Sequence, residues 1–111
     1  MRTILEQEKV SLLAAGAMAN FHNSTVNEVS QAVSQNEWVI IGMAQNPVVK
    51  KAKRHLDNKS IKYNYIEHGS YVSQWKKRLA IKLWSGWPTF PQVFHQGKLI
   101  GGAAELEKYL A

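Results

Sequence analysis

The sequence predicts a small α/β domain with one mixed, four-stranded sheet and helices on both of its faces. Three observations indicate this fold class. Helical and strand-like apolar patterns alternate along the chain after residue 23. An apolar run from Trp38 to Met43 has the character of a buried strand, and two short strand-like runs near the carboxyl end are joined by the turn Gln96-Gly97. The expected order of elements over residues 24–111 is αβαβαββα.

Length and composition agree with a single domain. The chain has 111 residues, of which 45% are apolar, and it contains four Trp. This is enough to bury one core, and no change of composition marks a second domain. No apolar run approaches the roughly 18 residues that a membrane span needs. We therefore expect one domain and no contact with a membrane.

Residues 1–23 form an extension with two interpretations. Apolar residues recur at spacings of three and four: Val10, Leu13, Ala14, Ala17 and Phe21. This spacing is typical of an amphipathic helix, which would pack on the domain or on a second copy to form a homodimer. The same stretch imitates a signal peptide covering Met1 to Ala19, although Glu6 and Glu8 are unusual ahead of such an apolar core. A retained helix predicts a cytoplasmic protein, and a signal peptide predicts an exported one.

The first helix of the domain is predicted from Thr25 to about Asn36. Thr25 and Glu28 have the spacing of a capping box. Apolar residues follow at the helical period: Val26, Val29 and Val33. We expect this helix to lead directly into the strand at Trp38 to Met43.

A second helix is predicted from Pro47 to about Leu56, because proline is favoured in a first turn and Asp57-Asn58 favours a turn. The alternation of polar and apolar residues over Lys62 to Ile66 predicts the next strand. The apolar residues between Tyr71 and Trp84 then predict a helix.

The carboxyl end is predicted to form a hairpin followed by a helix. Its strands are Gln92 to His95 and Lys98 to Ile100, on either side of the short turn. The closing helix covers Ala103 to Leu110. We expect this helix to pack through its two leucines.

The loop after the central strand is the most informative stretch. It reads Asn46-Pro47-Val48-Val49 where a thioredoxin-like protein carries its CxxC motif between a strand and a helix. The whole chain contains no cysteine. Since a thiolate is the nucleophile in disulfide exchange, an amide at position 46 cannot replace it. We therefore expect no thiol chemistry from the protein itself.

The second half of the chain resembles the glutaredoxin family. The residues that carry this resemblance are Trp87-Pro88-Thr89-Phe90-Pro91-Gln92, followed by Gly101-Gly102, and they look closest to the monothiol branch. The resemblance covers roughly residues 25 to 110 and implies a thioredoxin-like fold. It also implies a cis peptide bond before Pro91, beside a groove in which Phe90 offers its backbone to glutathione or a peptide. By family, the resemblance implies a role in cell redox homeostasis.

Several positions depart from the family pattern. The resemblance places a thiol at Asn46, a lysine at Met43 and an acidic residue at Ala104, so three polar groups are missing. Glu105 stands one position late. Monothiol members hold a bridging iron-sulfur cluster on their active-site Cys, and Asn46 is no iron ligand of useful strength. We expect no such cluster, no metal site and no resident cofactor, with at most weak binding of glutathione.

Other positions keep the family pattern and define a candidate groove for glutathione or a peptide. These are Arg78, Lys82, Trp87, Thr89, Phe90, Pro91, Gly101 and Gly102. The resemblance implies that Arg78 binds the glycine carboxylate of glutathione, which suits a guanidinium fork. The alternative is that Arg78 and Lys82 are solvated charges on a basic helix.

Net charge is +6, and the basic residues cluster on two predicted helices. One cluster is Lys50, Lys51, Lys53 and Arg54, and the other is Lys76, Lys77, Arg78 and Lys82. Such a field attracts acidic partners. Because no recognised nucleic-acid motif accompanies it, we expect no nucleic-acid partner.

Two hypotheses of function follow from these residues. In the first, the protein is a pseudo-enzyme, a binding or scaffold module whose groove holds an extended acidic or thiol-containing peptide. In the second, glutathione supplies the only thiol and the protein positions it, as in a glutathione-dependent oxidoreductase or transferase. The losses at Met43 and Ala104 favour the first.

Overall fold

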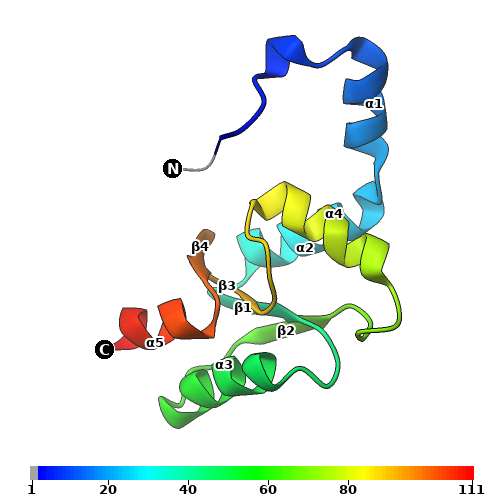
Figure 1. The fold of residues 1–111 in the computed structure, drawn as a ribbon. Helices are drawn as coiled ribbons and strands as arrows, with labels where there is room; N and C mark the ends of the chain where they lie inside the picture. Colours follow the sequence, from blue (N-terminus) through cyan, green and yellow to red (C-terminus); the bar gives the residue numbers. More distant parts are fainter. Residues whose placement is uncertain (1–2) are drawn as a thin grey trace.

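The computed structural model describes residues 3–111 and has a four-stranded sheet with helices packed on both faces (Figure 1). The strands lie in the order β2-β1-β3-β4. β1 and β2 are parallel, whereas β3 is antiparallel to both β1 and β4. In chain order the elements are η1 (Gln7–Lys9), α1 (Leu12–Asn20), α2 (Asn23–Gln35), β1 (Trp38–Gly42), α3 (Pro47–Asn58), β2 (Asn64–Glu67), α4 (Trp75–Ser85), β3 (Gln92–His95), β4 (Lys98–Gly101) and α5 (Ala103–Leu110).

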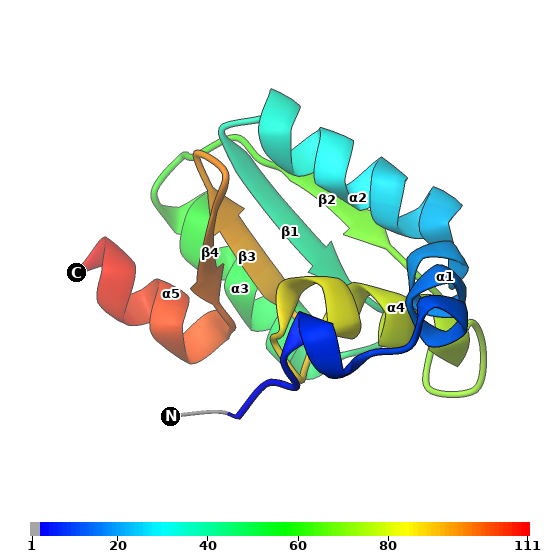
Figure 2. The ribbon, with the colours of Figure 1, turned by 90° about the horizontal axis from the view of Figure 1, so that it is seen from above.

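The apolar run of β1 is buried because both faces of the sheet are covered. Successive side chains of a strand point to opposite faces, so β1 contributes to two cores. Val39 and Ile41 pack against α2 and α4 through Val29, Val33 and Ile81. On the other face Ile40 packs against residues of α3 and α5: Ala52, Leu56, Ala103 and Leu106. Figure 2 shows α2 and α4 on one side of the sheet and α3 on the other.

Strand register gathers the predicted site at one end of the sheet. Gly42 at the end of β1 pairs with Glu67 at the end of parallel β2. Ile41 pairs with Gln92 at the start of antiparallel β3, and Gly101 at the end of β4 lies opposite Val93. The loops that follow β1, β2 and β4, and the loop that precedes β3, therefore meet at the same end.

Helix α2 begins earlier than the capping box predicts. It starts at Asn23, and His22 stands before it in a left-handed conformation with φ of 45° and no side-chain cap. Thr25 lies inside the first turn and is buried. The predicted cap at Thr25 is wrong, because the backbone N–H groups of Thr25 and Val26 donate to the carbonyl oxygen of His22, which places the helix start two residues earlier.

The N-terminal helix exists, but it does not pack as an amphipathic helix on the domain. α1 has no buried residue, and Leu13 is 89% exposed. Val10 and Phe21 lie outside the helix, at the ends of η1 and α1. The helix is apolar around most of its circumference and stands away from the sheet (Figure 1), so its spacing selects no buried side.

Two other boundaries differ from those predicted. α4 begins at Trp75, because residues 70–73 form a serine-stabilised turn in which Ser73 Oγ accepts from the backbone N–H of Ser70. Serine side chains that bind nearby backbone in this way compete with a helix. β2 runs from Asn64 to Glu67 and not from Lys62 to Ile66, because its ends are set by pairing with β1. The remaining helices and strands of the domain lie within about two residues of their predicted places.

No helix of the described residues is long and apolar enough to span a membrane.

Candidate functional site

Asn46 stands at the start of α3 and caps that helix. Its side-chain Oδ1 accepts from the backbone N–H groups of Val48 and Val49, at 2.9 and 3.0 Å. Asparagine is among the best residues for this position, since a short side-chain oxygen reaches the first free N–H groups of a helix. Asn46 is buried, so the amide is enclosed by the fold. The loop leads from a strand into a helix, as predicted, and it has an amide oxygen where the family pattern has a thiol.

The other three residues of the loop have different environments. Pro47 occupies the first helical position and is exposed. Val48 is 47% exposed, whereas Val49 is buried next to Gly42 at the end of β1. A Cβ atom at Gly42 would lie 2.8 Å from Val49 Cγ1 and 3.0 Å from Tyr65 Oη, so a glycine is needed at this close approach.

The peptide bond between Phe90 and Pro91 is cis. Both residues are buried. Within residues 3–111, neither the N–H nor the C=O of Phe90 has a hydrogen-bond partner. The Nζ of Lys82 lies 5.7 Å from the centre of the Phe90 ring. This places an unpaired main-chain segment and one cation together at the end of the sheet.

Trp87 lies against Gly101 and Gly102. A Cβ atom at Gly101 would be 3.2 Å from Trp87 Cη2, and one at Gly102 would be 3.8 Å from Trp87 Nε1 and 3.6 Å from the carbonyl oxygen of Pro91. Gly101 has φ of 124°, a conformation that side chains rarely adopt. Thr89 is exposed beside this group. Four of the predicted residues, Trp87, Pro91 and the two glycines, are thus brought together as one wall.

Arg78 is not a solvated charge. It is only 7% exposed, and its Nη1 donates to the carbonyl oxygens of His68 and Ser73. These contacts hold the loop between β2 and α4, and this loop in turn contacts the Asn46 loop, where Ala44 N donates to Gly69 O at 2.7 Å. That Arg78 binds a carboxylate stays a prediction. Lys82, by contrast, is partly exposed.

The two other departures from the family pattern have clear places. Met43 is buried in the core beside α2 and α4, where no cation could be accommodated without a partner. Ala104 is exposed in the first turn of α5. Glu105 does not replace an acid at position 104, because its Oε1 accepts from the backbone N–H of Gly102 at 3.0 Å.

The basic residues do not surround one groove. α3 and α4 lie on opposite faces of the sheet (Figure 2). On α3, Lys53 places its Nζ 3.5 Å from the centre of the Tyr65 ring. Tyr65 donates to Glu67 Oε1 at 2.9 Å. Burial, and then the hydrogen bond and charge of Glu67, raise the pKa of Tyr65 well above its usual value.

Gln92 is a site residue that the sequence prediction did not assign. It is fully buried, and its Nε2 donates to the carbonyl oxygen of Trp87 at 3.0 Å, which holds the loop before β3. Its Oε1 has no partner within the described residues. Two sequence signals were present: Gln92 belongs to the motif that carries the family resemblance, and it is a polar residue at the start of a buried strand. His68 was also unassigned, and its Nε2 lies 2.9 Å from Glu28 Oε1, linking the loop after β2 to α2.

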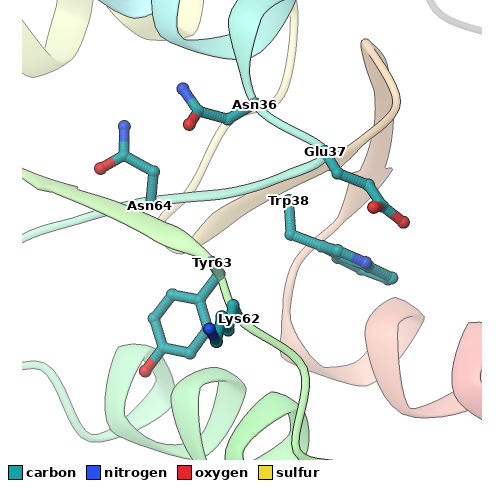
Figure 3. Close-up of a pocket in the computed structure, with 6 residues that line it drawn as sticks. All are labelled: Asn36, Glu37, Trp38, Lys62, Tyr63 and Asn64. Carbon is teal, nitrogen blue, oxygen red and sulfur yellow. The ribbon is translucent and has the colours of Figure 1, made fainter.

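A polar pocket lies at the other end of the sheet (Figure 3). Its volume is about 430 Å³, and it is lined by residues at the starts of β1 and β2: Asn36, Glu37, Trp38, Lys62, Tyr63 and Asn64. None of the predicted site residues lines it. The pocket is therefore separate from the loops that gather around Asn46 and Pro91.

Comparison with known proteins gives consistent results. Residues 47–100 match the family model described as Glutaredoxin. A glutaredoxin-like protein of Dictyostelium discoideum is 44% identical over 91 residues, which cover 82% of this chain and 74% of that protein. A glutaredoxin of Ricinus communis is 30% identical over 77 residues, covering 69% of this chain and 76% of that protein.

Solved structures show the same fold. The crystal structure of a buckwheat glutaredoxin–glutathione complex superposes with a TM-score of 0.69 and 26% sequence identity. The superposition covers 79% of this chain and 81% of that chain.

Proposed function

The chain belongs to the glutaredoxin family, and from this premise we propose that it is a non-catalytic member that binds an extended peptide in the groove beside Pro91. The peptide is acidic or carries a thiol, and the protein acts as a binding or scaffold module. The proposal keeps the cytoplasmic location expected from a retained N-terminal segment.

The observation that carries the proposal is the environment of Asn46. In a thiol enzyme of this fold, the N–H groups at the start of the helix favour the charged form of a cysteine. Here both N–H groups donate to the neutral amide oxygen of Asn46. The amide has neither a lone pair of thiolate strength nor a proton that can be removed near neutral pH. The loop is thus a stable part of the fold without a nucleophile.

The residues at Asn46 do not fit the iron-sulfur cluster that the monothiol branch implies. Iron-sulfur clusters are held by thiolates, and the chain has no cysteine. The Asn46 oxygen already accepts two hydrogen bonds. We therefore derive no role for such a cluster in this protein.

The wall formed by Trp87, Pro91, Gly101 and Gly102 supports peptide binding. The unpaired backbone of Phe90 offers one donor and one acceptor, as the edge of a sheet does for an added strand. Lys82 lies beside the Phe90 ring and provides a cation for an acidic side chain. Because Arg78 is bound to carbonyl oxygens, Lys82 is the more accessible of the two cations.

The test measures binding of a fluorescent nine-residue peptide that is rich in glutamate. A second peptide adds a cysteine, and a third, basic peptide tests whether binding requires negative charge. We expect the acidic peptide to shift the backbone N–H resonances of Phe90 and Gly102 in heteronuclear NMR. Lys82→Glu is expected to weaken binding by about tenfold or more, since it replaces attraction by repulsion. Lys98→Glu, at the far end of β4, makes the same change of net charge and should leave binding nearly unaffected.

A second assay separates this proposal from the glutathione-dependent enzyme. The purified protein, supplied with glutathione and a glutathione mixed disulfide, is expected to reduce the disulfide no faster than glutathione alone. Turnover that depends on protein concentration would exclude the non-catalytic proposal and favour the enzyme. In the NMR experiment with the acidic peptide, resonance shifts confined to residues away from Phe90 and Gly102 would mean that the peptide binds outside the proposed groove.

A further inference from the structure

The N-terminal helix α1 is apolar, and none of its residues is buried. Residues 10–21 contain no charged side chain, and Leu12 and Leu13 are 94% and 89% exposed. The Cα radius of gyration is 14.8 Å, whereas a compact domain of this length has about 13 Å. The difference reflects an extension that projects from the domain (Figure 1). A helix of nine residues is marginal in water unless its apolar side is covered.

A groove lies where α1 meets α2 and α4. Its volume is about 630 Å³, and its lining is mostly apolar. The large side chains in it are Met18, Phe21, Val26, Leu79, Leu83 and Trp84. Leu83 is 69% exposed and Met18 is 62% exposed, so the groove opens to solvent on the side from which α1 projects. An open apolar groove beside an uncovered apolar helix is a self-complementary pair of surfaces.

We propose that a second copy of this chain covers both surfaces, with α1 of each copy seated in the groove of the other around a two-fold axis. Each chain carries both the apolar helix and the groove. A two-fold dimer therefore covers the helix and the groove of each copy, and it leaves no groove free to bind a third chain. A short helix in an apolar groove is a common mode of recognition. The small residues from Ala14 to Ala17 let the helix approach closely.

The area available suits a stable dimer. Six large apolar side chains of each copy would take part, all of them at least 36% exposed: Leu12, Leu13, Met18, Leu79, Leu83 and Trp84. Covering them on both copies would bury on the order of 1,500 Å², which is the size of a standard stable interface.

Charge also favours a second copy. Glu6 and Glu8 precede α1, whereas Lys76 lies one helical turn before Leu79 and Ala80 on the groove side of α4. An α1 that enters the groove from a second copy brings these carboxylates toward a basic helix. Such a pairing of charges mainly fixes how the two copies are oriented and speeds their association, and it adds less to the affinity.

The first experiment is sedimentation of the full chain across a range of concentrations. We expect a dimer, and Leu13→Glu should raise its dissociation constant by about tenfold or more, because it places a charge in an apolar groove. Val72→Glu is the matched control, since Val72 is 92% exposed and lies outside the groove. Circular dichroism shows whether each variant is folded. A chain that is monomeric at every concentration, or a dimer that Leu13→Glu leaves unchanged, overturns the proposal.

A second experiment identifies which α1 fills the groove. Because the chain has no cysteine, the double variant Leu13→Cys/Leu83→Cys contains only the two introduced thiols. Mild oxidation should give a covalent dimer on a non-reducing gel if the helix comes from a second copy. A disulfide within one chain would mean that α1 folds back into its own groove, and this result also overturns the proposal. Leu99→Cys, on β4, reports the level of random cross-linking.

Discussion

The side-chain oxygen of Asn46 accepts a hydrogen bond from the backbone N–H of Val49, with 3.0 Å between Oδ1 and N. In the family pattern the first of these residues is the nucleophilic cysteine and the second is its partner in the CxxC frame. In this chain the pair is the cap of α3. Position 46 therefore caps the helix and carries no thiol.

Replacing the cap tests that structural role. Asn46→Ala should lower the free energy of unfolding by about 1 kcal/mol, because two N–H groups lose their acceptor. Asn46→Asp should be at least as stable as the natural chain, since a carboxylate caps equally well and is favoured at a helix amino end. Denaturant titration measures both. Equal stability of the alanine variant and the natural chain would mean that water replaces the cap without cost.

Restoring the thiol tests the electrostatics of the site. Asn46→Cys should give a cysteine with a pKa only modestly below the usual value of about 8.5, because the helix start favours the thiolate and buried Met43 supplies no cation. The rate of alkylation as a function of pH measures this pKa. A strongly lowered value would show that another cation, such as Lys50, has taken the place of the missing lysine.

Glutathione binding should be millimolar or undetectable. The amino end of glutathione would meet Ala104, and its sulfur would meet the amide of Asn46. Each lost charge-assisted hydrogen bond costs on the order of 1.5 to 3 kcal/mol, so two losses reduce affinity by roughly two to four decades. Chemical-shift titration checks this. Saturable shifts of Arg78, Phe90 and Gly102 at micromolar glutathione would contradict the prediction and favour the glutathione-dependent enzyme.

Arg78 should matter for stability. Arg78→Met would remove the donor that binds the carbonyl oxygens of His68 and Ser73, and leaving the buried acceptor of His68 unpaired costs about 1 to 3 kcal/mol. Lys51→Met, an exposed change on α3, should alter stability by less than about 0.5 kcal/mol. Thermal unfolding compares them. If Arg78→Met is as stable as the control, the loop does not depend on these contacts.

Stability at high pH should depend on Tyr65. Its raised pKa means that folding favours the neutral phenol. The contribution of Tyr65 to the free energy of unfolding is complete below the unfolded pKa of about 10. It is lost as pH rises through the higher pKa of the folded state. Burial, and then Asp57, raise the pKa of Tyr63 in the same direction. Tyr65→Phe should therefore weaken, without abolishing, the decline of unfolding free energy above pH of about 10.

The matched control for that experiment is Tyr71→Phe, which removes an exposed phenol. Spectroscopic titration of tyrosine ionisation follows the same groups in the folded chain. An unchanged alkaline decline in Tyr65→Phe would contradict the assigned role of Tyr65.

Local sequence patterns were sufficient for much of the fold. The unbroken apolar run of β1 predicted a central strand, and the turn at Gln96-Gly97 predicted the closing hairpin, because both signals depend on neighbouring residues only. The family motif around Pro91 then predicted the sheet and its arrangement. The pattern was less informative where a local turn sets the start of a helix, as at Asn23 after left-handed His22 and at Trp75 after the serine turn.

The sequence by itself determined that this protein has no thiol, and that no resident residue can take the place of one at position 46. Only the tertiary structure decided how the remaining polar groups are used. Arg78 was predicted to bind a carboxylate, yet its Nη1 donates to the carbonyl oxygens of His68 and Ser73 in the loop before α4. Glu105 stands one position late in the sequence, and it accepts from the backbone N–H of Gly102, the cap of its own helix. Leu13 looked like one side of a packed helix, yet it is exposed. The physical reason is that composition and spacing report which groups a chain contains, whereas the backbone conformation of the folded loops and the packing of the elements decide which partner each group finds.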